Sequence, residues 1–146
     1  MPKRLKIKKS PNVKHDLRGV KFAYQFARAR AQSWGKKLDG CEARITSTNC
    51  GYWGFCGRAW KYQRRVLLRL GKHLPPHLHV YPRFKEMPTF WLWGGDESIV
   101  YLAAHEFGHL IGWGHGKHAE IAACKFGYEA VEAWRSEQYD HPACLI

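Results

Sequence analysis

The chain is short of acidic residues and of long apolar segments, and each shortage excludes a class of protein. Only 12 Asp and Glu residues stand against 24 Lys and Arg residues in a chain of 146, which gives a formal net charge of +12. No apolar run approaches the roughly 18 residues that a membrane-spanning helix needs. The basic N-terminus is not followed by the apolar core of a signal peptide. We therefore expect no membrane contact and a cytoplasmic protein.

The cysteines also lack the spacing of common cysteine frameworks. Their number is odd and no two of them form a CxxC pair, which argues against a zinc ribbon and defines no clear disulfide pattern. We therefore expect reduced thiols. The five are Cys41, Cys50, Cys56, Cys124 and Cys144.

The positive charge is concentrated before residue 96. Residues 1–40 hold 12 Lys and Arg against 2 Asp and Glu, and residues 41–95 hold 9 against 2, whereas residues 96–146 hold 3 against 8. Such a basic region attracts polyanions, so nucleic acid is an expected partner of the basic N-terminal region. Because 45% of the residues are apolar, the chain can build a core. We expect a basic, flexible arm over 1–15 and one domain over 16–146.

Hydrophobic periodicity predicts an α+β fold, with an N-terminal helix, a small twisted β-sheet and two later helices. The first helix is predicted over 16–35 with Asp16 as its cap. The second begins at Asp96 or Ser98 and runs to about 112, and the last covers about 117–137. Strands are predicted within 43–70, including a hairpin closed by 61–64, and at 90–93, with a short strand possible at 77–81.

The motif His105-Glu106-Phe107-Gly108-His109 lies in the second of these helices. Residues four apart share one helix face, so His105 and His109 can bind the same ion. Glu106 lies beside them, where it can accept a proton from a water molecule. This HExxH arrangement is typical of zinc hydrolases, so we expect Zn²⁺ and peptide-bond hydrolysis.

A catalytic zinc usually has a third protein ligand, and two residues compete for that role. His115 completes the spacing HExxHxxGxxH, in which Gly112 permits the turn that returns the chain to the metal. Glu120 heads a small or apolar stripe that should face inward, where a carboxylate needs a cation or a hydrogen-bond partner. His118 lies on a face predicted to be exposed and is the weakest candidate.

Three resemblances accompany this motif. The HExxHxxGxxH spacing resembles the metzincins, although no methionine follows His115 to form their Met-turn. The ExxAxxF stretch from Glu120 to Phe126 resembles gluzincin-type peptidases, including ImmA-like ones, and this resemblance implies that Glu120 binds zinc. The hairpin over 57–70 before an HExxH helix resembles SprT-like peptidases, which implies His115 instead.

These resemblances imply a zincin-like fold and a protein or peptide substrate. SprT-like proteins include enzymes that degrade proteins attached to DNA, so substrates associated with nucleic acid are implied as well. In zincin-type folds the last strand before the HExxH helix borders the cleft, which would make Trp91 and Trp93 substrate-binding residues. The alternative for both is packing in the core.

Two other functions remain open at this point. The chain could be a basic nucleic-acid-binding protein with a structural or degenerate zinc site. It could also be a regulatory protease that cleaves one partner protein.

Overall fold

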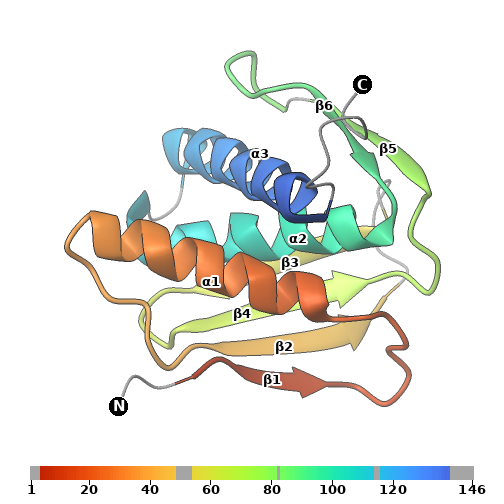
Figure 1. Cartoon of the computed structure of the whole chain (residues 1–146), viewed down its shortest axis with the longest axis horizontal. Helices are drawn as coiled ribbons and strands as arrows, with labels where there is room; N and C mark the ends of the chain where they lie inside the picture. The colour runs from red at the N-terminus through yellow and green to blue at the C-terminus, as the bar shows by residue number, and fades with distance from the viewer. Residues whose placement is uncertain (1–3, 49–53, 82, 114–115, 139–146) are drawn as a thin grey trace.

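The computed structural model describes residues 4–48, 54–81, 83–113 and 116–138 and has the expected α+β organisation (Figure 1). Three α-helices lie in these ranges: α1 (Arg18–Ser33), α2 (Gly95–Gly108) and α3 (Lys117–Gln138). None of them is long and apolar enough to cross a membrane. The strands are β1 (Lys6–Lys9), β2 (Glu42–Ser47), β3 (Phe55–Trp60), β4 (Arg65–Leu70), β5 (His77–Val80) and β6 (Phe90–Trp93).

The strands form two separate sheets. The larger has the order β1-β2-β4-β3, in which β1, β2 and β4 run parallel and β3 pairs antiparallel with β4. The predicted hairpin is therefore confirmed as β3–β4, and β3 is an edge strand. The smaller sheet is an antiparallel ribbon of β5 and β6. Residues alternate between the two faces of a strand, and Ala43, Ile45, Val66 and Leu68 turn one face toward the helices.

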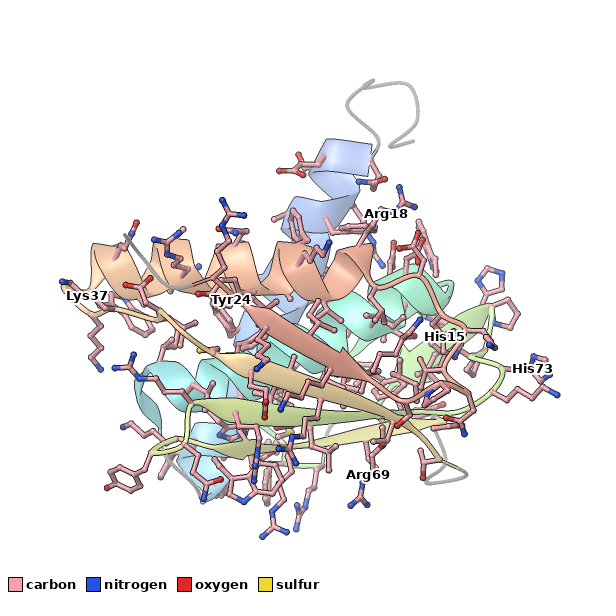
Figure 2. The ribbon with its side chains drawn as sticks, turned by 90° about the horizontal axis from the view of Figure 1, so that it is seen from below. His15, Arg18, Tyr24, Lys37, Arg69 and His73 are labelled. Atoms are coloured by element: carbon pink, nitrogen blue, oxygen red, sulfur yellow. The ribbon has the colours of Figure 1, made fainter. Side chains whose placement is uncertain are left out.

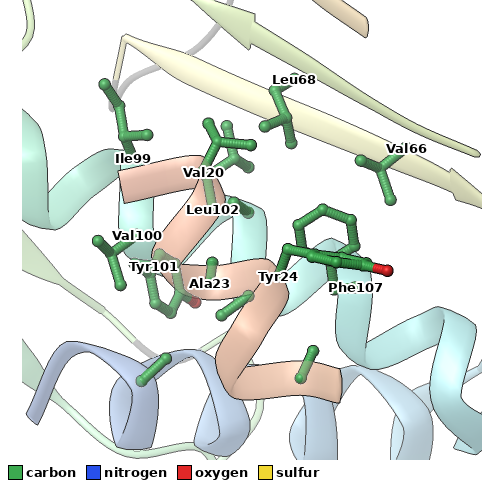
Figure 3. Close-up of a cluster of buried hydrophobic side chains, with 14 of the residues drawn as sticks. Val20, Ala23, Tyr24, Val66, Leu68, Ile99, Val100, Tyr101, Leu102 and Phe107 are labelled. Atoms are coloured by element: carbon green, nitrogen blue, oxygen red, sulfur yellow. The ribbon is translucent and has the colours of Figure 1, made fainter. Parts of the chain in front are cut away.

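The core lies between α1, α2 and this inner sheet face (Figure 3). Tyr24 on α1 meets Phe107 on α2 edge to face, with ring centroids 5.6 Å apart, and its hydroxyl donates to the carbonyl of Leu38 at 2.7 Å. Gly19 lets the two helices approach closely, because a Cβ there would lie 3.0 Å from a methyl group of Val100. This packing fixes α2, the helix that carries the HExxH motif.

The N-terminal segment differs from the flexible arm that the sequence predicts. Residues Lys6–Lys9 form β1, whose first backbone N–H donates to the carbonyl of Cys41 at 2.9 Å, and Val13 is buried. Only Leu5 and Ile7 alternate with lysines here, a pattern too short to predict the pairing with β2 from the sequence. The predicted cap of α1 is wrong by one residue: Leu17 is the N-cap and makes no side-chain cap hydrogen bond, while Asp16 before it accepts a hydrogen bond from the backbone N–H of Arg18.

The start of α2 also differs from the prediction. The helix begins at Gly95, and neither Asp96 nor Ser98 caps it through a side chain. Glu97, which is 2% exposed, instead accepts a hydrogen bond from the backbone N–H of Trp93 at 2.8 Å and two from Arg135 of α3. One buried carboxylate thus joins β6, α2 and α3.

Candidate metal centre

The HExxH motif lies at the C-terminal end of α2, where the chain reverses direction. His109 begins a π-helical turn over His109–Trp113. This turn contains Gly112 with φ of 147°, a backbone conformation that residues with a side chain rarely adopt. The helix α3 then returns against α2, which brings Glu120 in its first turn back to the motif. Gly112 therefore ends the helix as expected.

His105, His109 and Glu120 converge on one point. The Nε2 atom of His105 lies 3.2 Å from Oε2 of Glu120, and the Nε2 atom of His109 lies 3.0 Å from Oε1. One donor atom from each of the three residues falls within 4.8 Å of the others. Two imidazole nitrogens and one carboxylate are a donor set that catalytic zinc uses. The geometry therefore fits a single metal ion.

Burial and charge distinguish the two carboxylates of the site. Hydrogen bonds from His105 and His109 hold the pKa of Glu120 well below its ordinary range, so this side chain is ionised at neutral pH. Burial raises the pKa of Glu106, which is only 5% exposed, and the nearby charge of Glu120 raises it further, while the two histidines oppose the shift. Glu120 is thus suited to hold a cation, and Glu106 to exchange a proton.

Glu106 lies against the edge strand β3. A Cβ on Gly57 would lie 2.7 Å from Oε2 and 2.8 Å from Cγ of Glu106, so only glycine leaves room for this carboxylate. The sequence motif identifies Glu106 but does not reveal that its position depends on a residue almost fifty positions earlier.

A cavity of about 290 Å³ opens beside these residues. His105, Glu106 and Glu120 line it together with β3 residues and with the segment that follows β5. Sequence reasoning missed the remaining wall, because no spacing pattern links strand, loop and helix residues. The other lining residues include Phe55, Gly57, Arg83, Met87, Tyr101 and Leu102.

Neither Trp91 nor Trp93 lines this cavity, and their predicted role in substrate binding stays a prediction. The two residues are 51% and 57% exposed on β6, which pairs with β5 in the small ribbon. Trp91 stacks on His79, and Arg135 lies over the ring of Trp93. They are therefore not core residues either. The strands that border the cavity are β3, through Phe55, Cys56 and Gly57, and β5, through Val80.

The other candidate ligands have different outcomes. His118 is exposed and does not belong to the metal-binding group, as expected. His115 lies outside the described residues, so its role as the competing third ligand stays a prediction. The Nδ1 atom of His105 is buried and has no hydrogen-bond partner among the described residues. This imidazole therefore lacks the second contact that usually orients a zinc-binding histidine.

The cysteines agree only in part with the expectation of reduced thiols. Cys41 and Cys124 are free and buried. Burial raises the pKa of the Cys41 thiol to about 11, which makes it unreactive at neutral pH. The Sγ atom of Cys124 shares a hydrogen bond with the hydroxyl of Tyr101 at 3.2 Å. Cys56, in contrast, is disulfide-bonded, so the expectation is wrong at that position.

Comparison with known proteins adds no relative to this description. No family model matches the chain, and neither the curated proteins nor the solved structures contain a match to it.

Proposed function

We propose that this chain is a zinc-dependent metallopeptidase with a zincin-like arrangement. The observation that supports the proposal best is the convergence of His105, His109 and Glu120 beside a cavity that Glu106 also lines. A structural zinc site needs no cavity and no additional carboxylate, and such sites are usually closed by four protein ligands. The combination therefore favours catalysis over a structural or degenerate site.

Each residue of the site has a role in this proposal. The three converging side chains would hold Zn²⁺, which when bound polarises a substrate carbonyl and makes water more acidic. Glu106 accepts a proton from the attacking water and passes it to the leaving amine. Its buried position and raised pKa suit both steps, because the group must take up a proton and then release it.

The edge strand β3 is the best placed element to bind an extended substrate. Within the described ranges it pairs with β4 on one side only, so its other edge can add a peptide strand through main-chain hydrogen bonds. Phe55, Met87 and Leu102 provide apolar surface in the adjoining cavity. We therefore propose that the enzyme prefers an apolar side chain near the cleaved bond.

The ligand set supports the gluzincin and ImmA-like resemblance more than the SprT-like one. Glu120, the first residue of the ExxAxxF stretch, lies within hydrogen-bond distance of both histidines.

We also propose a cytoplasmic location. The free thiols of Cys41 and Cys124 favour it, whereas the disulfide at Cys56 argues against it.

Metal analysis combined with a peptidase assay tests the function. Purified protein should carry about one zinc per chain and cleave a mixture of unfolded proteins. Glu106→Gln should keep the zinc and lose activity by about 10²–10⁴-fold, the usual contribution of a general base. Glu132→Gln, an exposed change of the same kind on α3, is the matched control and should keep full activity. Wild-type protein without bound metal, or an active Glu106→Gln variant, would exclude the proposal.

A further inference from the structure

The larger sheet has one face that no described helix covers. The strand register places the inward row Ile7, Ala43, Val66 and Ala59 side by side, and the last three are buried against the helices. Neighbouring positions in each strand must therefore point to the opposite side. Arg69 does so, because it and α1 lie on opposite sides of the sheet (Figure 2). We call this side the open face.

The open face is an array of cations. Lys and Arg occupy six of its positions, and Glu42 is the single acidic residue among the outward positions of the four strands. Glu42 pairs with Lys8 at 3.0 Å and with Arg44 at 2.9 Å, so the face keeps a large positive surplus. The six basic residues are Lys6, Lys8, Arg44, Arg58, Arg65 and Arg69.

The spacing of this array is set by the sheet. Outward positions repeat about every 7 Å along a strand, and adjacent strands lie about 4.8 Å apart, so the four strands span roughly 14 Å. A face of this width can reach the phosphates on both sides of a minor groove, which is about 6 Å wide. The cations are thus distributed in two dimensions, as contact with two phosphate rows requires.

We propose that the open face binds double-stranded DNA through its phosphates, without sequence preference. Charge complementarity is the main argument, because phosphate contacts supply most of non-specific DNA binding. Among the described outward positions of the four strands, Trp60 is the one aromatic residue, and Arg58 and Arg65 both lie over its ring at 5.4 and 4.7 Å, so it is not free to stack on single-stranded bases. Its outward apolar residue Leu67 is half-buried, which leaves little to insert into a membrane.

The open face and the cavity share the edge strand β3. Arg58 points to the open face, while its neighbour Gly57 contacts Glu106 and lines the cavity. A duplex bound there would therefore lie close to the cavity, and this consequence for the active site rests on the proposed function. The binding face itself stands independently of catalysis.

Anisotropy of a labelled 20-base-pair duplex of arbitrary sequence tests the proposal with the full chain. The variant Arg44→Gln/Arg58→Gln/Arg69→Gln removes three exposed cations from the face. We expect at least tenfold weaker binding at 0.1 M salt. The slope of log affinity against log salt should fall by about 2–3, because each phosphate contact contributes about 0.9. The corresponding triple Lys variant keeps the charges and should keep most of the binding.

The matched control is Lys21→Gln/Lys37→Gln/Lys125→Gln, which removes the same charge from exposed positions away from the open face. It should weaken binding less than threefold. Equal weakening by both triple variants would overturn the proposal, because only net charge would then matter. Tighter binding to the single strand than to the duplex, or binding to anionic phospholipid vesicles without duplex binding, would overturn it too. Peptide cleavage without duplex binding would refute DNA binding by the open face and leave the proposed function standing. Duplex binding without peptide cleavage would refute the proposed function and leave DNA binding standing.

Discussion

Gly57 of β3 and Glu106 of α2 are in direct contact: a Cβ on the glycine would lie 2.7 Å from Oε2 of the carboxylate. The two residues belong to different layers of the fold, and α2 packs closely on β3. The position of the general base in our proposal therefore depends on a strand that contributes no chemistry of its own.

Gly57→Ala should reduce activity without unfolding the protein. The new methyl group must displace the Glu106 carboxylate, and a misplacement of about 1 Å can cost 10²-fold in rate. Zinc content should stay at the wild-type value. Gly127→Ala is an instructive contrast, since its Cβ would lie 2.8 Å from the Tyr101 ring and 3.1 Å from the Tyr101 carbonyl. That change should lower Tm instead. Unchanged kcat/KM in Gly57→Ala would show that the contact does not position the base.

Glu120→Ala should weaken zinc binding more than about 100-fold, because even contacts outside the ligand shell contribute 10–100-fold. Competition with a zinc chelator measures this. His118→Ala is the control, since His118 is exposed on the same helix turn, and its zinc affinity should not change. His115→Ala decides between the two candidate ligands: a large loss there, with none in Glu120→Ala, would assign the third ligand to His115.

Glu106→Gln should stabilise the metal-free protein at neutral pH. The folded-state pKa of Glu106 is raised, so its contribution to stability is fully present below the ordinary pKa of about 4.5 and is lost as pH rises through the folded value. At pH 7 an ionised Glu106 carboxylate is unfavourable in its buried position. Glutamine carries no charge there, so Tm at pH 7 should rise by a few degrees. The difference between variant and wild type should shrink near pH 4. A lower Tm at pH 7 would contradict this account.

Arg135→Met should destabilise the fold severely. Arg135 donates to the buried Glu97 at 3.0 and 2.7 Å, and loss of one partner of a buried pair costs about 3–5 kcal/mol. Denaturant unfolding measures the free energy. Arg18→Met, which breaks an exposed pair with Asp16, should leave the free energy of unfolding nearly unchanged, because solvent screens such pairs. The double variant Glu97→Gln/Arg135→Met should recover part of the loss, and no recovery would argue that packing of the arginine matters more than its charge.

The local parts of the site could be predicted from the sequence. His105 and His109 are one helical turn apart, so their common direction follows from helix geometry alone. Glu120 could be proposed because a carboxylate at the head of an inward stripe needs a partner, and the structure supplies two imidazoles. These inferences need only the neighbours within one helix.

The parts that depend on distant pairing could not be predicted. The position of β6 directly before α2 predicts Trp91 and Trp93 as cleft residues, yet the strand residues that line the cavity come from β3 and from Val80 of β5. The strand β1 was missed because its backbone pairs with β2 while its lysines stay in solvent. Sheet order is set by which strands meet across the whole chain, and a local pattern does not report it.

The reversal at Gly112 has a consequence for how mutations would act on this protein. Because the converging side chains come from α2 and from α3, on either side of this turn, retention of the proposed ion would depend on this helical hairpin. The position of Glu106, the proposed general base, would instead depend on the sheet, through Gly57. A mutation in the strands could therefore leave metal binding intact and abolish activity, whereas a mutation in the hairpin would abolish metal binding and activity together.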